Sequence, residues 1–332
     1  MERINIDPLL KQIKACVDRH NLGTPGAYCR WTVGEQASNT VNEYGVADAA
    51  NILYTIGEFS DAMEHRADWI RVLQDMQDPQ TGMYHEATHY AVHTTAHCTA
   101  ALELFDAKPL HRCKELEEFL DISHFHHFME NNIRWAEDPW TDSHLGAGIF
   151  VCLSNAGMID LAWKDGYFQW FWDNTDPETG FPIYKPEENR KLLNYRYMAG
   201  AFHYFFNHES EHRPMRYPEK VIDTCIDMIV KREGTFLLHC NFIDIDVVYC
   251  LNRAMRQTPH RFYEAKQILE VYAQEYLDLL MNRTDYENDV YFNDLHALFG
   301  AVCCVAELQS ALPGKIISSK PLKLVLDRRP FI

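Results

Sequence analysis

The chain has 332 residues, of which 47% are hydrophobic, and it carries a formal net charge of −17 at pH 7. This composition excludes an intrinsically disordered chain and supplies enough apolar side chains for one large domain or two ordinary ones. The negative charge argues against nucleic acid and anionic membranes as partners, because binding to both relies on Lys and Arg.

Helical periodicity runs along almost the whole chain, whereas strand signals are scarce. The expected helices lie near 6–19, 43–57, 62–76, 91–105, 110–132, 142–156, 160–173, 195–207, 218–231, 241–255, 260–281 and 293–311. The second helix of each pair is rich in small and apolar residues, and the first carries a charged face. Because a helix that is apolar on all sides is buried, the alternation predicts an inner and an outer ring of helices.

Short polar and aromatic clusters recur about every 50 residues, and each opens one of the apolar helices. The clusters are Asn42–Tyr44, His85–His89, Trp140–His144, Asn194–Arg196, His239–Asp246 and Asn293–His296. A repeat of this length indicates repeated supersecondary units rather than one irregular core. Polar residues at the same position of each unit would point to one place, which predicts a closed helical barrel with a site at one mouth.

The connections contain a repeated turn pattern, with D-P-Q-T-G at Asp78–Gly82 and D-P-E-T-G at Asp176–Gly180. Together with the alternating helices and their period, this pattern resembles the (α/α)6 toroid superfamily. That superfamily includes six-hairpin glycoside hydrolases, polysaccharide lyases and sugar epimerases, with terpenoid cyclases and protein prenyltransferases as relatives. The segment Gln77–Tyr84 is most similar to the corresponding turn of unsaturated-glycuronyl hydrolases. The resemblance implies an all-α fold, an (α/α)6 barrel of six helical hairpins.

No low-complexity linker divides the chain, so we expect residues 1–313 to form one domain and residues 314–332 an extended C-terminal tail. The N-terminal residues lack the apolar core of a signal peptide, and no apolar stretch approaches about 18 residues. The ten cysteines lie mostly inside apolar helical runs and form no CxxC pair, which indicates buried, reduced thiols. These features predict a cytoplasmic protein.

Several acids lie at the starts of the expected inner helices, where unpaired N–H groups give a partial positive charge. Hydrolysis of a glycosidic bond needs one carboxylic acid to protonate the leaving oxygen and one carboxylate to activate water or attack. We expect Asp142 and Asp246 to form this acid/base pair. The further catalytic candidates are Glu86, His144 and Asp294. The alternative is that these acids only cap helices.

Trp140 lies beside an acid and a His, a combination that suits a sugar, because its CH face stacks on an aromatic ring and its hydroxyls need polar partners. Arg196 is placed to hold a substrate carboxylate with two hydrogen bonds. Tyr195 and nearby His residues would instead suit a lyase, in which they remove and return protons. The other expected substrate-binding residues are Trp31, His89, His93, Asn241 and Asp244.

The segment His85–His89 matches H-E-x-x-H, in which two His on one helical face bind zinc and the Glu acts as general base. His93 and His97 continue the spacing of four residues, and such a ladder either binds a metal or lines a polar pocket. We expect no metal and no other cofactor, with zinc at His85 and His89 as the alternative.

The main hypothesis is a carbohydrate-active enzyme, a glycoside hydrolase with a small-molecule or oligosaccharide substrate. The alternatives are a polysaccharide lyase or sugar epimerase using Tyr and His, a terpenoid cyclase or prenyltransferase-like enzyme, a zinc-dependent hydrolase, and a non-catalytic binding toroid. Carboxyl groups about 5–10 Å apart across a pocket would favour glycoside hydrolysis. Three N or O ligands about 2.1 Å from one point would favour zinc.

Overall fold

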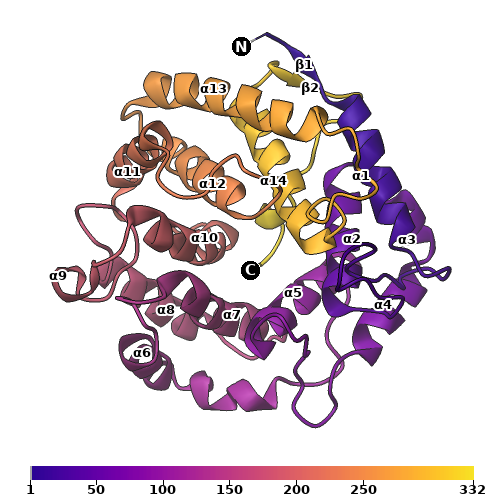
Figure 1. The fold of residues 1–332 in the computed structure, drawn as a ribbon. Helices are drawn as coiled ribbons and strands as arrows, with labels where there is room; N and C mark the ends of the chain where they lie inside the picture. Colours follow the sequence, from indigo (N-terminus) through magenta and orange to yellow (C-terminus); the bar gives the residue numbers. More distant parts are fainter. Residues whose placement is uncertain (1) are drawn as a thin grey trace.

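Six helices, each buried along most of its length, form the inside of the molecule. The structure is a computed structural model, and it describes residues 2–332. The six helices are α2 (Glu43–Thr55), α5 (Ala91–Leu104), α7 (Pro139–Asn155), α10 (Asn194–Ser210), α12 (Ile243–Met255) and α14 (Leu295–Ala311). Each packs against the next one in the chain, and α14 packs back on α2, so that the six close into a ring (Figure 1). Their small and apolar side chains explain this placement, because no side of these helices favours water.

Amphipathic helices surround the ring. The longer ones are α1 (Asp7–Arg19), α4 (Arg66–Asp75), α6 (Ile122–Asn131), α8 (Leu161–Asp173), α11 (Pro218–Lys231) and α13 (Phe262–Met281). The shorter ones are α3 (Ser60–Glu64), α9 (Pro186–Asn189) and the 3-10 helix η1 (Lys114–Leu120). In α1, for example, Leu9, Ile13 and Val17 are buried at helical spacing. The all-α prediction is therefore confirmed.

Two expected helices differ from the structure. The helix expected at 62–76 is interrupted at His65, where α3 ends and α4 begins. The helix expected at 110–132 is replaced by η1 followed by α6. Asp121 separates these two elements, because its side chain accepts a hydrogen bond from the Ser123 backbone N–H and so caps a new helix start.

The two D-P-x-T-G segments form the same turn, as the sequence predicts. The N–H of Gly82 donates to the Asp78 carbonyl at 2.7 Å, and the N–H of Gly180 donates to the Asp176 carbonyl at 2.8 Å. Both glycines have positive φ, 77° and 79°. A Cβ atom on Gly82 would lie 1.8 Å from the Arg112 carbonyl oxygen, so only glycine fits there.

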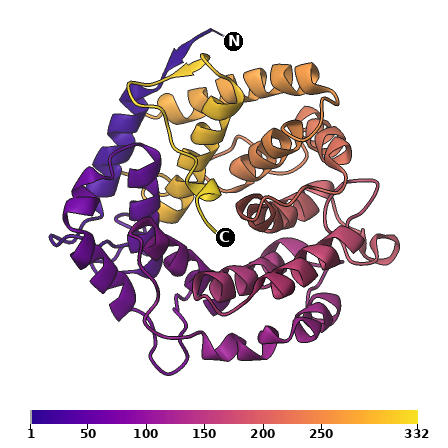
Figure 2. The ribbon, with the colours of Figure 1, turned by 180° about the vertical axis from the view of Figure 1, so that it is seen from behind.

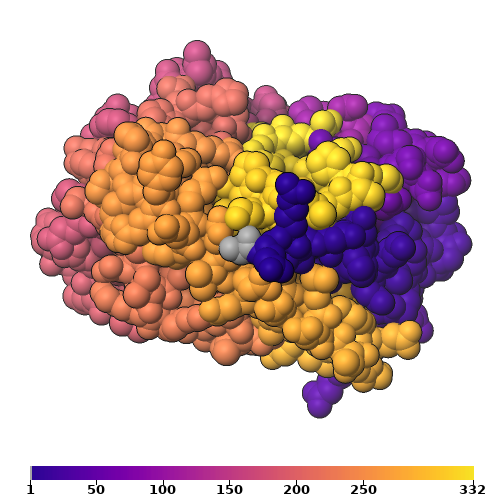
Figure 3. Space-filling view, turned by 90° about the horizontal axis from the view of Figure 1, so that it is seen from above, coloured from indigo at the N-terminus to yellow at the C-terminus, as the bar shows by residue number. Residues whose placement is uncertain are grey.

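The residues after Pro313 are more than an appended tail. Strand β2 (Ile316–Ile317) pairs in parallel with β1 (Ile4–Asn5), and the two segments lie together on the surface (Figure 3). Beyond the 3-10 helix η2 (Val325–Asp327) the chain enters the ring, where both ribbon views place the C-terminus (Figures 1 and 2). Phe331 and Ile332 are buried there.

All ten cysteines are buried and free, which confirms the expectation of buried, reduced thiols. Within residues 2–332, no helix has both the length and the apolarity needed to cross a lipid bilayer.

Candidate functional site

The ring of inner helices encloses a cavity of about 530 Å³. Its polar lining comes largely from the clusters at the helix starts that the sequence singled out. The expected site residues that line it are His89, His93, Trp140, His144, Arg196, Asn241 and Asp294. The expected residues outside the lining are Trp31, Glu86, Asp142, Tyr195, Asp244 and Asp246. The structure therefore brings seven of the thirteen candidates together and leaves six outside the lining.

Imidazoles dominate the polar part of the cavity, and aromatic and aliphatic side chains form much of the rest. The imidazoles are His89, His93, His97, His144, His203, His239 and His296. The apolar side chains include Phe202, Phe206, Phe242, Ile245, Phe299, Leu326, Phe331 and Ile332. Such a lining suits a partly apolar ligand that carries a few fixed polar groups.

Asp48 on α2 forms hydrogen bonds with two of these imidazoles. Its fully buried carboxylate lies 2.6 Å from Nε2 of His97 and 3.0 Å from Nδ1 of His296. Burial alone would raise the pKa of Asp48, but His97 and His296 outweigh it and lower this pKa. Burial lowers the pKa of His296 to about 4, although Asp48 acts in the opposite direction. The neutral His296 therefore donates its Nδ1–H to Asp48 and keeps a lone pair on Nε2.

A second imidazole, that of His89, is held by the loop before α5. Its Nδ1 lies 2.7 Å from the Thr88 hydroxyl, which donates to Glu86 at 2.5 Å. Burial would raise the pKa of Glu86, but hydrogen bonds from His89 and Thr88 and the charge of Arg30 lower it to about 2. Glu86 is thus an ionised residue that orders this loop. The rings of His89 and His296 are 5.0 Å apart.

Arg30 fixes the position of the Asp294 carboxylate in the cavity wall through two hydrogen bonds. Its Nε and Nη2 donate to the two carboxylate oxygens of Asp294 at 2.9 and 3.2 Å. The guanidinium carbon lies 4.2 Å from the Trp31 ring centroid, so Trp31 packs against Arg30 and does not reach the cavity. Asp294 also accepts from the backbone N–H of His296 and caps α14. Its carboxylate lines the cavity, but its oxygens are occupied.

Asp142 is bound by Arg134 and does not line the cavity. One carboxylate oxygen accepts from Arg134 Nη2 at 2.7 Å, and the other accepts from the Arg134 backbone N–H and Nε at 2.7 and 3.0 Å. Its side chain is 3% exposed and lies outside the cavity lining. Asp142 therefore fixes the entry to α7, and the expected pair with Asp246 does not form.

Asp244 and Asp246 belong to α12, but neither side chain lines the cavity. Asp244 accepts from the Tyr272 hydroxyl and from the Leu237 backbone N–H, and burial raises its pKa to about 6. Within residues 2–332, neither oxygen of the fully buried Asp246 has a hydrogen-bond partner. Burial, with a smaller contribution from Asp244, raises the pKa of Asp246 well above its ordinary value.

Replacing Asp246 by asparagine is expected to raise the free energy of unfolding at pH 7 by about 1–3 kcal/mol, because the amide does not ionise in the unfolded chain and so removes the pH-dependent cost of burying this carboxyl. The folded chain keeps this carboxyl protonated, whereas the unfolded chain ionises it above its ordinary pKa of about 3.9. The wild type therefore loses stability as pH rises above about 4, and the gain in Asp246→Asn shrinks toward that pH. Urea unfolding at several pH values measures both effects.

The matched control is Asp142→Asn, which is expected to change stability in the opposite direction because it breaks the ion pair with Arg134. Loss of turnover in Asp246→Asn with unchanged stability would contradict this assignment and return Asp246 to the catalytic candidates.

The H-E-x-x-H segment does not have the geometry of a zinc site. Residues 85–89 form a loop ahead of α5, and His85 is exposed. Two His that share no helical face lack the arrangement that this motif requires. Tyr195 is also outside the cavity, and its backbone N–H donates to Glu233. In contrast, Arg196 lines the cavity and forms an ion pair with Asp138 at 2.6 Å.

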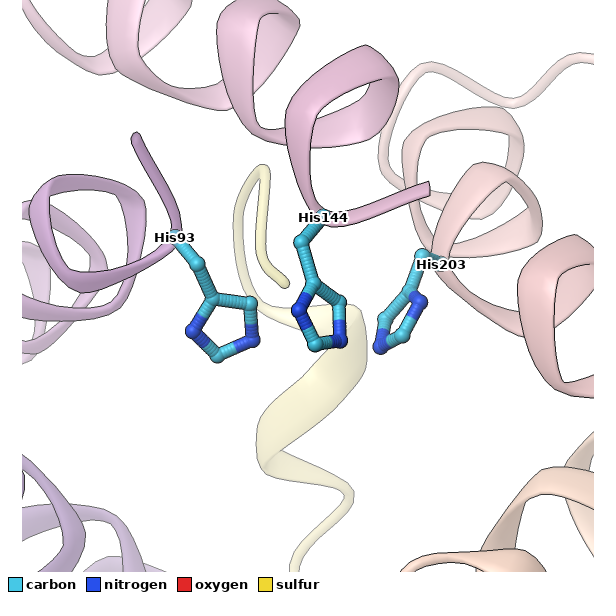
Figure 4. A group of neighbouring side chains, drawn as sticks. All are labelled: His93, His144 and His203. Carbon is cyan, nitrogen blue, oxygen red and sulfur yellow. The ribbon is translucent and has the colours of Figure 1, made fainter. Parts of the chain in front are cut away.

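Two groups of ligand-type side chains are close enough to hold a metal ion, among the residues that the structure describes. One group is Asp48, His97 and His296, in which hydrogen bonds already join the carboxylate to both rings. The other is His93, His144 and His203 (Figure 4). The sequence candidates omitted Asp48 and His203, whereas His97 was named in the His ladder and His296 in the last of the six clusters. The only sequence feature that could have identified Asp48 and His203 is that each is a polar residue inside an otherwise apolar inner helix.

No protein-family model, curated protein or solved structure matches this chain.

Proposed function

We propose that this chain is an (α/α)6 toroid that acts on an acidic carbohydrate as a polysaccharide lyase, with His side chains as base and acid. The closed ring of α2, α5, α7, α10, α12 and α14 inside a layer of amphipathic helices supports the toroid. The observation that best supports lyase chemistry is the pair of cavity imidazoles, His296 and His89. A hydrogen bond to Asp48 orients His296, and a hydrogen bond to Thr88 orients His89.

His296 has the properties of a general base. Asp48 fixes its ring and its tautomer, and its low pKa keeps Nε2 unprotonated at neutral pH. A base of this kind removes the proton on the carbon next to a sugar carboxylate. The electron pair of that C–H bond forms a C=C bond, and the glycosidic C–O bond on the next carbon breaks. The leaving oxygen takes a proton from the imidazolium form of His89, which lies beside the Glu86 carboxylate and leaves the step as the neutral ring. The His89 ring is 5.0 Å from that of His296.

The cavity mouth suits an acidic sugar. Arg196 pairs with Asp138 through Nη2, and its side chain remains 31% exposed at the cavity, where the other guanidinium N–H groups can bind a carboxylate. Trp140 and the stacked rings of His239 and Tyr291, 3.9 Å apart, offer flat aromatic surfaces for the CH faces of a sugar.

Two neighbouring reactions are less well supported. Hydrolysis by two carboxylates would need Asp142 and Asp246 in the cavity, and both lie outside it. Epimerisation would need proton removal and proton return on opposite faces of the sugar ring. The rings of His89 and His296 are only 5.0 Å apart, which suits proton removal and leaving-group protonation on the same side of the sugar.

The test is to incubate the purified protein with uronate-containing oligosaccharides and to follow the products by mass spectrometry and ultraviolet absorbance. We expect two fragments whose masses sum to that of the substrate, one of them with a C=C bond conjugated to the carboxylate. A neutral oligosaccharide of equal length is the matched control and should remain intact. Fragments that together gain one water would contradict the lyase and restore the hydrolase. Deuterium uptake from D2O without cleavage would indicate an epimerase.

A further inference from the structure

Three imidazoles from three consecutive inner helices meet in the cavity wall. His93 comes from α5, His144 from α7 and His203 from α10, and one ring nitrogen of each lies within 4.8 Å of the others (Figure 4). In a tetrahedral site with Zn–N bonds of about 2.0–2.1 Å, two ligand nitrogens are roughly 3.4 Å apart. Small rotations of these rings therefore suffice to bring all three nitrogens to one metal ion.

Hydrogen bonds fix the tautomer of His203. The Ser143 hydroxyl donates to the Trp140 carbonyl, so its oxygen is left to accept from His203 Nδ1–H at 2.8 Å. A neutral imidazole carries one N–H, and Nε2 of His203 therefore keeps its lone pair.

Tyr44 contacts the outer nitrogen of His93. The Tyr44 oxygen lies 2.5 Å from Nδ1 of His93 and 3.3 Å from the Thr94 hydroxyl, which donates to the Tyr90 carbonyl. A neutral His93 that binds a metal through Nε2 carries its proton on Nδ1 and donates it to the Tyr44 oxygen. Metal-binding His residues commonly donate their second ring N–H in this way, since the hydrogen bond orients the ring.

His144, between the other two, has no hydrogen-bond partner for either nitrogen among residues 2–332, although its ring lies 4.3 Å from that of His93 and 4.9 Å from that of His203. Burial lowers the pKa of His93 and His144 well below the ordinary value and that of His203 to about 3. The cluster thus consists of three neutral imidazoles, each of which can offer one ring nitrogen to a shared ion. A cation at the centre would satisfy all three.

We propose that His93, His144 and His203 bind one divalent transition-metal ion, zinc in the first instance, with an open coordination position toward the cavity. Three imidazole ligands suit zinc, cobalt, nickel or copper better than magnesium or calcium, which prefer oxygen. Three protein ligands with a free fourth position are typical of a zinc ion that contacts a substrate or water. This site is separate from the acid/base pair of the proposed lyase and does not depend on it.

The group formed by Asp48, His97 and His296 is not a second site in this proposal. Its carboxylate already accepts from both rings, and Nδ1 of His97 faces the Ile332 backbone oxygen at 3.2 Å. We therefore expect one metal ion per chain.

The experiment uses untagged protein stripped with a chelator. Cobalt(II) is titrated in while visible absorption is recorded, and zinc affinity is measured by competition with a chromophoric chelator. We expect one cobalt ion per chain with the intense bands of a tetrahedral site, displaced by one zinc ion. His144→Asn should weaken binding by more than about 100-fold, and Ser143→Ala, which leaves the ligands in place, by about 10–100-fold.

The matched control is His85→Asn, because His85 is exposed and belongs to the H-E-x-x-H segment. Its metal affinity should equal that of the wild type. If His144→Asn fails to fold, His203→Gln replaces it. Absence of metal binding by the wild type would overturn the proposal. So would equal affinity in wild type and His144→Asn, or loss of binding in His97→Asn alone. None of these readouts needs a substrate, so the metal site and the lyase stand or fall separately.

Discussion

Replacing Arg253 by methionine is expected to lower the free energy of unfolding by about 3–5 kcal/mol, the range for breaking a buried ion pair. The Arg253 side chain is fully buried and forms an ion pair with Glu307, which is 1% exposed. It also binds Asp327 at 2.6 Å, and its guanidinium lies 4.5 Å from the Tyr249 ring centroid. Methionine fills a similar volume but leaves the Glu307 carboxylate buried without its cation. Equilibrium unfolding in urea measures the change.

The matched control is Arg256→Met. Arg256 contacts Glu209 and Asp327 from the same cluster but is 39% exposed, so its loss should change stability by no more than about 1 kcal/mol. The double variant Arg253→Met with Glu307→Gln should recover much of the lost stability, because glutamine removes the unpaired charge and can still accept from Asn252. Equal effects of Arg253→Met and Arg256→Met would contradict the buried ion pair as the cause.

The sequence predicts the helices of this fold well because their burial follows directly from composition. Helices with few charged residues have no favourable surface position, so the inner helices are recognised from the chain alone. The turns at Asp78–Gly82 and Asp176–Gly180 are recognised for a similar reason, since their conformation depends on Asp, Pro and Gly at fixed places. The short elements depend on single contacts, and the break between η1 and α6 at Asp121 is one that periodicity cannot show.

The candidate site is predicted in location but only partly in composition. Asp142 and Asp246 have the residue type and the position that a hydrolase needs, yet Asp142 is bound by Arg134 and Asp246 is buried outside the cavity lining. Whether a carboxylate at a helix start faces the cavity depends on the rotation of the helix. An error of one residue turns the side chain by about 100°. His203 and Asp48 were missed for the converse reason, because a single polar residue in an apolar helix carries no motif until its neighbours in space are known.

The C-terminal segment also shows what local sequence patterns cannot predict. Its sequence indicates an extended tail, yet Phe331 and Ile332 line the cavity, and Arg329 donates to the Asn51 side chain at 2.7 Å. The hydrogen bond between Arg329 and Asn51 joins residues 278 positions apart in the chain, and local sequence patterns contain no signal for such a contact.

Under the proposed lyase, replacing His296 by asparagine is expected to lower kcat by about 10²–10⁴-fold while leaving KM nearly unchanged, because the base acts on the proton in the transition state. Asp48→Asn should lower kcat less, since the imidazole remains but loses the carboxylate that orients it. The Asp48 charge also raises the pKa of His296 against the effect of burial. Its removal should therefore lower that pKa and move the acidic limb of the kcat/KM profile to lower pH.

This shift of the pH profile distinguishes an effect of Asp48 on the base from a purely structural role of Asp48. If Asp48 only supported packing, Asp48→Asn would reduce the amount of folded enzyme and leave the shape of the pH profile unchanged. His85→Asn is again the control, because it alters an exposed His on the same loop as His89 and should leave both kcat and the profile as in the wild type. A wild-type kcat in His296→Asn would remove His296 as the base. The proton would then have to be taken by an imidazole of the cavity lining outside the proposed metal cluster, and His239 is the first to examine.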